Sequence, residues 1–257
     1  MTNVALHHRV EGNAHGPPVL LAPSLGTTLG MWDELAAALW ERYRVVRIDT
    51  RGHGGSPAPK GPYTVDELVG DVLTLTERLG IDRFAMVGLS LGGAIAQTLA
   101  LRAPERLTAM VLACTGPSFG DPANWWQRAA EVRAAGMSGL VEPSKQRWFT
   151  PDFPRQRPDR SNQLLKQLAH TSPEGYASCC EALAQFDVSG RLGEITTPTR
   201  VIVGADDEVS PPSVGRTLRD GIPNADLVVI DEASHIANVA QPGTFNTAVL
   251  QHLDNHP

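Results

Sequence analysis

The chain has 257 residues and a net charge of −6. At roughly 150 residues per domain, this length predicts one large domain, or a core with a small insert. Hydrophobic residues make up 42% of the chain, which also has 24 glycines. This composition is that of an ordinary globular protein and excludes a disordered or fibrous one. The excess of acidic over basic residues disfavours nucleic acid or another polyanion as a partner.

Cysteine use and the N-terminal segment bear on the compartment. Cys114, Cys179 and Cys180 are too few for a disulfide framework, and two of them are adjacent, so we expect a reducing, cytoplasmic setting. Residues 1–16 have no apolar stretch behind a basic start, so no secretory signal is expected there. Residues 84–101 carry no charge and just reach spanning length, but their glycines and polar residues argue against a membrane segment.

Short apolar, β-branched runs recur along the chain and predict buried strands. They lie at residues 19–21, 43–48, 84–87, 107–112, 201–203 and 227–230. Between them, in residues 65–79, apolar residues recur every three or four positions, which predicts a helix. Thr64 and Glu67 form a capping-box start for this helix, and Gly80 is a stop signal. Alternating strands and helices predict an α/β fold with a mostly parallel sheet flanked by helices.

The alternation fails in one segment, residues 116–187. This stretch is rich in Trp, Arg, Pro and Gln, and shows weak amphipathic helices at residues 125–135 and 162–169. Because the strand pattern resumes after it, we interpret it as a helical cap inserted into a core made of residues 1–115 and 188–257. A second, unrelated helical domain is the alternative.

The most informative segment is a buried strand that enters Gly88-Leu89-Ser90-Leu91-Gly92 and leaves as the helix 94–102. A strand-to-helix turn this sharp holds its central residue in a strained conformation and exposes the side chain, and glycines two positions away avoid collisions. The helix that follows directs its first amides at developing negative charge. Ser90 is therefore the predicted nucleophile. A free serine is a poor nucleophile, so a base and an orienting acid must follow.

His235 is the predicted base, because it follows the strand at 227–230 through a short polar loop. His53 also follows a strand and is the rival, although the chain order serine, acid, histidine favours His235. The acid is expected in the loop after the strand at 201–203, where Asp206, Asp207 and Glu208 stand together. Spacing alone does not choose among these three.

A donor pair for the oxyanion completes the expected machinery. One amide should belong to Leu91, immediately after the nucleophile. The second should come from the loop Pro23-Ser24-Leu25-Gly26-Thr27, where Gly26 permits close approach and Leu25 offers its N–H. An ordinary strand-to-helix loop is the alternative.

With these motifs the chain resembles the α/β-hydrolase superfamily over essentially its whole length, and within it the 3-oxoadipate enol-lactonases of bacterial β-ketoadipate catabolism. The stretches that carry the resemblance are residues 23–27, 31–33, 49–56, 61–64, 88–93, 148–151, 234–238 and 241–242. Three of them, Ser24–Thr27, Trp148–Pro151 and Ser234–Asn238, are more particular to the lactonases. Pro23 and Ala240 depart from the family pattern, which often has Asn and usually has Glu at these positions.

The resemblance implies an esterase that hydrolyses a small enol-lactone through an acyl-enzyme on Ser90. In that family the acid usually stands three residues after the strand's glycine, which implies Asp207. The substrate would carry a carboxylate arm, so the cap should supply apolar walls and a cation. The cap residues available for these roles are Trp125, Trp126, Trp148 and Phe149 as walls, and Arg128, Arg133 and Arg147 as cations. Trp148 is the predicted substrate-binding residue, with the arginine left open.

Two rival functions remain at this stage. One is a broader carboxylesterase or perhydrolase, and the other is a non-catalytic ligand receptor on a hydrolase fold. Dehalogenase and epoxide hydrolase chemistry is disfavoured, because those relatives place an aspartate where Ser90 stands. The sequence has neither a His-Glu-x-x-His helix nor a Cys-x-x-Cys pair nor a dinucleotide glycine loop, so no metal or cofactor is expected. The expected partner is a small lactone, with no membrane contact, and the oligomeric state is open.

Overall fold

The computed structural model of the chain describes residues 3–256. Met1, Thr2 and Pro257 lie outside the described residues, so the expectation about a signal in residues 1–16 falls partly outside them.

A single sheet of seven strands forms the centre of the described chain, in the order β1-β3-β2-β4-β5-β6-β7. The strands are β1 (His8–Gly12), β2 (Pro18–Ala22), β3 (Arg44–Ile48), β4 (Phe84–Leu89), β5 (Leu107–Ala113), β6 (Thr199–Gly204) and β7 (Ala225–Ile230). All neighbours are parallel except β1, which runs antiparallel to β3. The predicted α/β class with a mostly parallel sheet is confirmed. Parallel strands end at one edge, and loops at that edge commonly form ligand sites.

Strand β1 was not among the predicted strands. It lies at an edge of the sheet, and its burial pattern is intermediate and exposed throughout. The sequence His8-Arg9-Val10-Glu11-Gly12 has a single apolar side chain, so neither an apolar run nor a clear alternation indicates a strand. By contrast, all six residues of β4 are buried, as expected for a strand covered on both faces.

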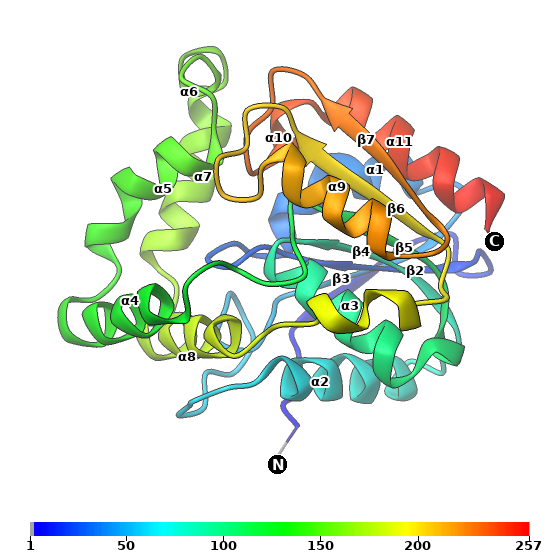
Figure 1. The fold of residues 1–257 in the computed structure, drawn as a ribbon, viewed down its shortest axis with the longest axis horizontal. Helices are drawn as coiled ribbons and strands as arrows, with labels where there is room; N and C mark the ends of the chain where they lie inside the picture. The colour runs from blue at the N-terminus through cyan, green and yellow to red at the C-terminus, as the bar shows by residue number, and fades with distance from the viewer. Residues whose placement is uncertain (1–2, 257) are drawn as a thin grey trace.

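Helices cover the two faces of the sheet. The helices of the core are α1 (Asp33–Leu39), α2 (Val65–Arg78), α3 (Leu91–Arg102), α9 (Pro212–Gly221), α10 (Ala237–Ala240) and α11 (Pro242–Asn255). Helices α1 and α11 pack together on one side, and α2 and α3 pack together on the other (Figure 1). Large buried side chains such as Trp32, Phe84 and Phe245 fill the space between helices and sheet.

The predicted start and end of α2 are confirmed. The Thr64 side chain accepts a hydrogen bond from the Glu67 amide, and the Glu67 carboxylate accepts one from the Thr64 amide. This reciprocal pair satisfies two of the amides that a helix start leaves without partners. At the other end Gly80 takes a φ of 64°, a left-handed conformation that glycine adopts without strain.

Between β5 and β6 the chain leaves the sheet and forms a separate group of helices, drawn in green to yellow-green in Figure 1. These cap helices are α4 (Pro122–Ala135), α5 (Val141–Trp148), α6 (Phe153–Gln156), α7 (Pro158–Ala169) and α8 (Pro173–Ala184). The two helices expected here correspond to α4 and α7. The division into core residues 1–115 and 188–257 and cap residues 116–187 stays a prediction.

Candidate active site

The turn between β4 and α3 holds Ser90 in a strained backbone conformation, with φ 56° and ψ −111°. Such a positive φ is uncommon for a residue with a side chain and marks a functional position when the surroundings enforce it. A side chain at Gly88 would place its Cβ 2.2 Å from the Gly92 carbonyl oxygen, and one at Gly92 would lie 2.1 Å from the Ala22 carbonyl oxygen. Both glycines are therefore sterically required.

Hydrogen bonds fix the backbone of Ser90 on both sides of the turn. Its amide donates to the carbonyl oxygen of Ala113 at 2.9 Å, and its own carbonyl oxygen accepts from the Thr115 hydroxyl at 2.9 Å. The Ser90 hydroxyl makes no capping bond within the described chain. Ser90 as a residue is 6% exposed. Because its hydroxyl forms no hydrogen bond with the described residues, no structural role competes with nucleophilic attack.

His235 and Asp207 meet at the same edge of the sheet. His235 Nδ1 lies 3.0 Å from Asp207 Oδ2, and both residues are buried. The other carboxylate oxygen of Asp207 accepts from the amides of Val209 at 2.8 Å and Ser210 at 3.0 Å. This arrangement orients the imidazole and supports its positive charge if it takes a proton.

The pKa of Asp207 lies below its usual range. Burial on its own would raise this pKa, but the charge and hydrogen bond of His235 and the amides of Ser210 and Val209 outweigh burial. Asp207 is therefore ionised at neutral pH. The neighbouring acids Asp206 and Glu208 are exposed, so among the three candidates it is Asp207 that reaches the histidine.

Ser90, Asp207 and His235 come from the ends of three parallel strands, β4, β6 and β7, that run toward the cap (Figure 1). Within residues 3–256 no hydrogen bond joins the Ser90 hydroxyl to the imidazole of His235. Catalytic hydrogen bonds are often long before substrate binds and shorten in the substrate complex. The structure thus places the three residues at one sheet edge, and their roles stay a prediction.

The two predicted oxyanion donors, the amides of Leu25 and Leu91, donate no hydrogen bond within the described residues. Leu91 is the first residue of α3, where amides have no partner inside the helix. In the loop after β2, the Leu25 amide donates to no group of the described residues, whereas the next amide, of Gly26, donates to His53 Nε2 at 2.9 Å. Gly26 has a φ of 79°, so this loop conformation favours glycine.

His53 has a place in this geometry other than that of a base. It is buried, and burial lowers its pKa. Its Nε2 accepts from Gly26, so its Nδ1 carries the proton and donates to the Arg51 carbonyl oxygen at 3.2 Å. The unprotonated nitrogen of His53 already accepts a hydrogen bond from Gly26, so it is not free to take a proton from Ser90. His53 instead supports the loop that carries Leu25.

The cap lies directly over the oxyanion loop. A Cβ built on Gly26 would lie 2.5 Å from Leu168 Cδ1, 3.3 Å from Tyr176 Cε2 and 3.6 Å from Trp148 Cζ2. The Trp148 side chain is thus buried beside the loop that carries Leu25, and its role in substrate binding stays a prediction.

The other aromatic side chains suggested for the wall lie elsewhere. Trp126 is 43% exposed, Trp125 donates its indole N–H to the Phe119 carbonyl oxygen, and Phe149 stacks on Phe153 with ring centroids 4.8 Å apart. Of the four aromatic residues, Trp148 is therefore the one that the structure places against Gly26.

Two direct contacts join the cap to the core at this site. The Ser234 hydroxyl donates to the Arg147 carbonyl oxygen at 2.9 Å, and the Ile236 amide donates to the Trp148 carbonyl oxygen at 3.1 Å. These bonds flank His235 and tie its loop to the end of α5. On another side, Gly52 and Gly175 are in backbone contact, because a Cβ on either would lie within 2.5 Å of the other's Cα.

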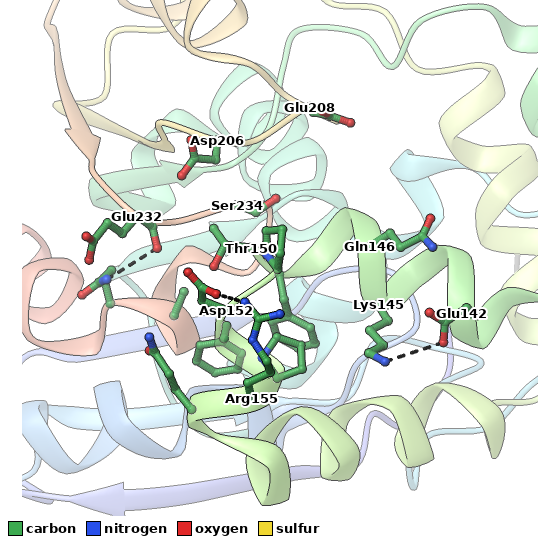
Figure 2. Close-up of a pocket in the computed structure, with 17 residues that line it drawn as sticks. Glu142, Lys145, Gln146, Thr150, Asp152, Arg155, Asp206, Glu208, Glu232 and Ser234 are labelled. Atoms are coloured by element: carbon green, nitrogen blue, oxygen red, sulfur yellow. Dashed lines mark hydrogen bonds and ion pairs between the residues drawn. The ribbon is translucent and has the colours of Figure 1, made fainter.

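A cavity of about 760 Å³ lies outside this site, between the cap and the loops after β6 and β7 (Figure 2). We call it the outer cavity. It is lined by Ser234, Asp206 and Glu208 but not by Ser90 or His235. Its charged residues are the acids Glu142, Asp152, Asp206, Glu208 and Glu232 and the bases Lys145 and Arg155. Both bases pair with an acid of the same cavity, Lys145 with Glu142 and Arg155 with Asp152.

Residues 3–256 contain no cluster of three or more His, Cys, Asp or Glu side chains that could hold a metal ion. No helix in this part of the chain has the length and apolar character needed to cross a membrane. Cys114, Cys179 and Cys180 are free, buried thiols, and burial raises the pKa of each.

Comparisons with known proteins show the family of the chain. Residues 17–242 match the family described as alpha/beta hydrolase fold. The chain is 42% identical to 3-oxoadipate enol-lactonase 2 of Acinetobacter baylyi, over 96% of this chain and 92% of that protein. The crystal structure of the enol-lactonase from Burkholderia xenovorans LB400 is 40% identical with a TM-score of 0.95, covering 98% of this chain and 97% of that one. A malate-bound thermophilic esterase from Thermogutta terrifontis is 27% identical with a TM-score of 0.94, covering 99% and 95%.

Proposed function

Since this chain belongs to the α/β-hydrolase family, we propose that it is a serine hydrolase that opens 3-oxoadipate enol-lactone to 3-oxoadipate. The observation that carries the proposal is the strained turn at Ser90, at the sheet edge where Asp207 orients His235. The 42% identity to an Acinetobacter enol-lactonase and the likeness to the Burkholderia enol-lactonase support the choice of substrate. The reaction would then belong to the β-ketoadipate pathway of aromatic catabolism.

In the proposed first step, Ser90 Oγ attacks the ring carbonyl carbon while His235 Nε2 takes the hydroxyl proton. The carbonyl oxygen becomes negative and is stabilised by the amides of Leu91 and Leu25, which act in a site largely closed to water. Asp207 holds the imidazole by Nδ1 and stabilises the imidazolium.

Collapse of the tetrahedral intermediate breaks the ring C–O bond, and the imidazolium returns the proton to the leaving enol oxygen. The enol remains tethered to the acyl group, and its tautomerisation to a ketone removes the nucleophile that would re-close the ring. His235 then takes a proton from water, the resulting hydroxide attacks the acyl carbon, and Ser90 leaves with that proton. The product is the open 3-oxo acid, and no step uses a metal or cofactor.

We propose that the reaction takes place in the cytoplasm. The support is that all three cysteines are free thiols, as is usual in a reducing compartment.

The proposal is tested by assaying the hydrolysis of freshly generated 3-oxoadipate enol-lactone. The reaction is followed as a loss of the ultraviolet absorbance of the lactone. We expect kcat/KM for the lactone to exceed that for p-nitrophenyl acetate by at least about 100-fold, since only the lactone uses binding energy from its carboxylate arm. The malate-bound esterase favours one alternative, a broader carboxylesterase. Comparable values of kcat/KM for the two substrates would establish that alternative. If a fluorophosphonate probe failed to label Ser90, the protein would instead be a non-catalytic receptor.

A further inference from the structure

A methionine side chain holds the loop that carries Leu25. Met31 lies in the short helical turn Leu29–Trp32. The Ser24 amide donates to Met31 Sδ at 3.4 Å, and the Thr27 hydroxyl lies 3.0 Å from the same sulfur. A thioether is a weak acceptor, but all three residues are buried, so the sulfur and the loop are packed as one unit. Met31 therefore contacts the loop on both sides of Leu25.

The main chain of Met31 is tied to the segment that follows His235. Asn238, a buried residue of α10, donates from Nδ2 to the Met31 carbonyl oxygen at 2.8 Å, across 207 residues of sequence. The helix α10 also packs against the helical turn that contains Met31. Arg160 lies 3.5 Å from the same oxygen, which is too long for a strong bond. Asn238 is therefore the donor that fixes the Met31 carbonyl.

The two ends of this series of contacts act on the same centre in the proposed reaction. The Leu25 amide stabilises the negative oxygen, and His235 exchanges protons with Ser90. These groups come from separate loops, after β2 and after β7, and a misplacement of about 1 Å can cost about 100-fold in rate. Within residues 3–256 no hydrogen bond joins residues 23–28 directly to residues 231–236. The link through Asn238 and Met31 thus connects them indirectly.

The amide of Asn238 is present at a cost to stability. Its Oδ1 is buried and has no hydrogen-bond partner among the described residues. A buried acceptor without a partner is unfavourable for folding, so it offsets much of what the Nδ2 bond contributes. Such a group calls for an explanation other than stability, and the position that it gives to Met31 provides one.

We propose that Asn238 is a positioning residue, which acts through Met31 to fix the Leu25 amide relative to the imidazole of His235. This inference rests on the proposed hydrolase function and adds to it a residue that touches neither the substrate nor the reacting atoms. Loss of Asn238 should displace a donor that matters most in the transition state. It should therefore lower kcat and leave KM nearly unchanged.

Asn246, in α11, provides a matched control. Its Nδ2 donates to the Glu34 carbonyl oxygen at 3.1 Å, and its Oδ1 is also buried without a partner in the described chain. Glu34 belongs to α1 and has no hydrogen bond with residues 24–27 in the part of the chain that the structure describes. Removing Asn246 thus deletes the same kind of bond, between α11 and α1, without reaching the oxyanion loop.

The test compares Asn238→Leu and Asn238→Ala with Asn246→Leu and Asn246→Ala. The measured quantities are kcat and KM for 3-oxoadipate enol-lactone, the rate of fluorophosphonate labelling, and the melting temperature, with kcat expressed per labelled serine so that misfolded protein is not counted. Both Asn238 variants should lower kcat and the labelling rate about 10- to 100-fold, with KM changing less than about 3-fold. The Asn246 variants should keep both rates within about 2-fold of the wild type, because they lose a bond of similar stability but no positioning contact.

Met31→Leu completes a double-mutant cycle with Asn238→Ala. If Asn238 acts through Met31, the loss of kcat in the double variant should be clearly smaller than the product of the two single losses. A loss equal to that product would mean that the two residues act independently, and the proposed route would be wrong. Equal values of kcat in the Asn238 and Asn246 variants would overturn the positioning role altogether.

Labelling by the fluorophosphonate separates the inference from the function on which it rests, because it requires Ser90, His235 and the oxyanion amides but no lactone. If the wild type hydrolyses the lactone and the Asn238 variants do so equally well, the positioning role is wrong and the function stands. If the wild type is labelled but does not hydrolyse the lactone, the proposed substrate is wrong, and slower labelling of the Asn238 variants still supports the positioning role. A wild type that is neither labelled nor active would overturn both.

Discussion

The sheet edge and the cap meet at Gly26 and on both sides of His235, and they hold their polar groups in opposite ways. At the edge, two polar side chains have fixed backbone partners: Asp207 accepts hydrogen bonds from two amides besides its bond with His235, and His53 accepts one from the Gly26 amide. In the cap, Arg128 and Arg147 have no acid within ion-pair distance among the described residues. The edge holds its reactive groups in one geometry, and the cap leaves two guanidinium charges without an acidic partner in the described residues. Variants of the edge should therefore lower kcat, whereas variants of the cap arginines should raise KM.

The largest effect is expected from Ser90→Ala. Because this change removes the nucleophile, kcat for the lactone should fall by a factor on the order of 10⁶, and labelling by a fluorophosphonate should disappear. The melting temperature should change little, since the hydroxyl makes no capping bond within the described chain. Retained turnover of the lactone would show that another group attacks the substrate and that the edge is not the reactive region.

Asp207→Asn should have the next largest effect. The change keeps the shape of the side chain but removes the charge that orients and supports His235, and we expect kcat to fall about 10⁴-fold. Asp206→Asn is the matched control and should stay within about 2-fold, because Asp206 is exposed. Equal losses in the two variants, measured by steady-state kinetics, would contradict the assignment of the acid.

His53→Leu tests the support of the oxyanion loop. Without the acceptor at Nε2, the Gly26 amide loses its partner and the neighbouring Leu25 amide loses its position, so kcat should fall about 10- to 100-fold with little change in KM. His53→Gln keeps an acceptor and should recover part of the loss, and His15→Gln, at an exposed histidine, should have no effect. A loss near 10⁴-fold without rescue would instead make His53 the base.

The buried His53 should also make the stability of the protein depend on pH, which a His53 variant can test. Burial lowers the pKa of His53 in the folded protein, so the unfolded chain binds the proton more readily. The free energy of unfolding should then decrease as the pH falls below about 6.5, the unfolded value. In urea unfolding at a series of pH values, His53→Gln should show a weaker decrease than the wild type.

The smallest effect is expected from Ser234→Ala, at the joint between the two regions. It removes the hydrogen bond from the Ser234 hydroxyl to the Arg147 carbonyl oxygen and should reduce the free energy of unfolding by about 1 kcal/mol. Because this bond ties the loop of His235 to the end of α5, kcat should fall a few-fold for the lactone and for p-nitrophenyl acetate alike. Ser213→Ala, at an exposed serine of α9, is the control for thermal unfolding and kinetics.

The sheet edge was largely predictable from the sequence, because its signals are local. Ser90 and Leu91 follow from five consecutive residues, and the buried strands are short apolar runs. Choosing Asp207 from spacing was impossible, since the choice depends on which carboxylate folds back to accept the amides of Val209 and Ser210. The role of His53 depends on a contact with Gly26, 27 residues away, which no local pattern contains.

The cap was less predictable for two physical reasons. Every residue of α8 from Gly175 to Ala184 is buried, so the helix lacks the polar face that produces an amphipathic period. The difference between Arg133 and the unpaired arginines arises from Glu174 and Glu181, 41 and 48 residues away. Which charges are neutralised is a property of the folded cap rather than of any short stretch of sequence.

The backbone contact between Gly52 and Gly175 leaves no room for a side chain where α8 meets the core. With two main chains touching and no side chain between them, a single methyl group at either position would act as a spacer and push α8 away from the core. Tyr176 is the next residue along α8, so its ring would withdraw from Gly26 as the helix moved. Adding one carbon atom at this junction would thus widen the opening above the reacting bond and admit bulkier esters, without any change to a group that performs chemistry.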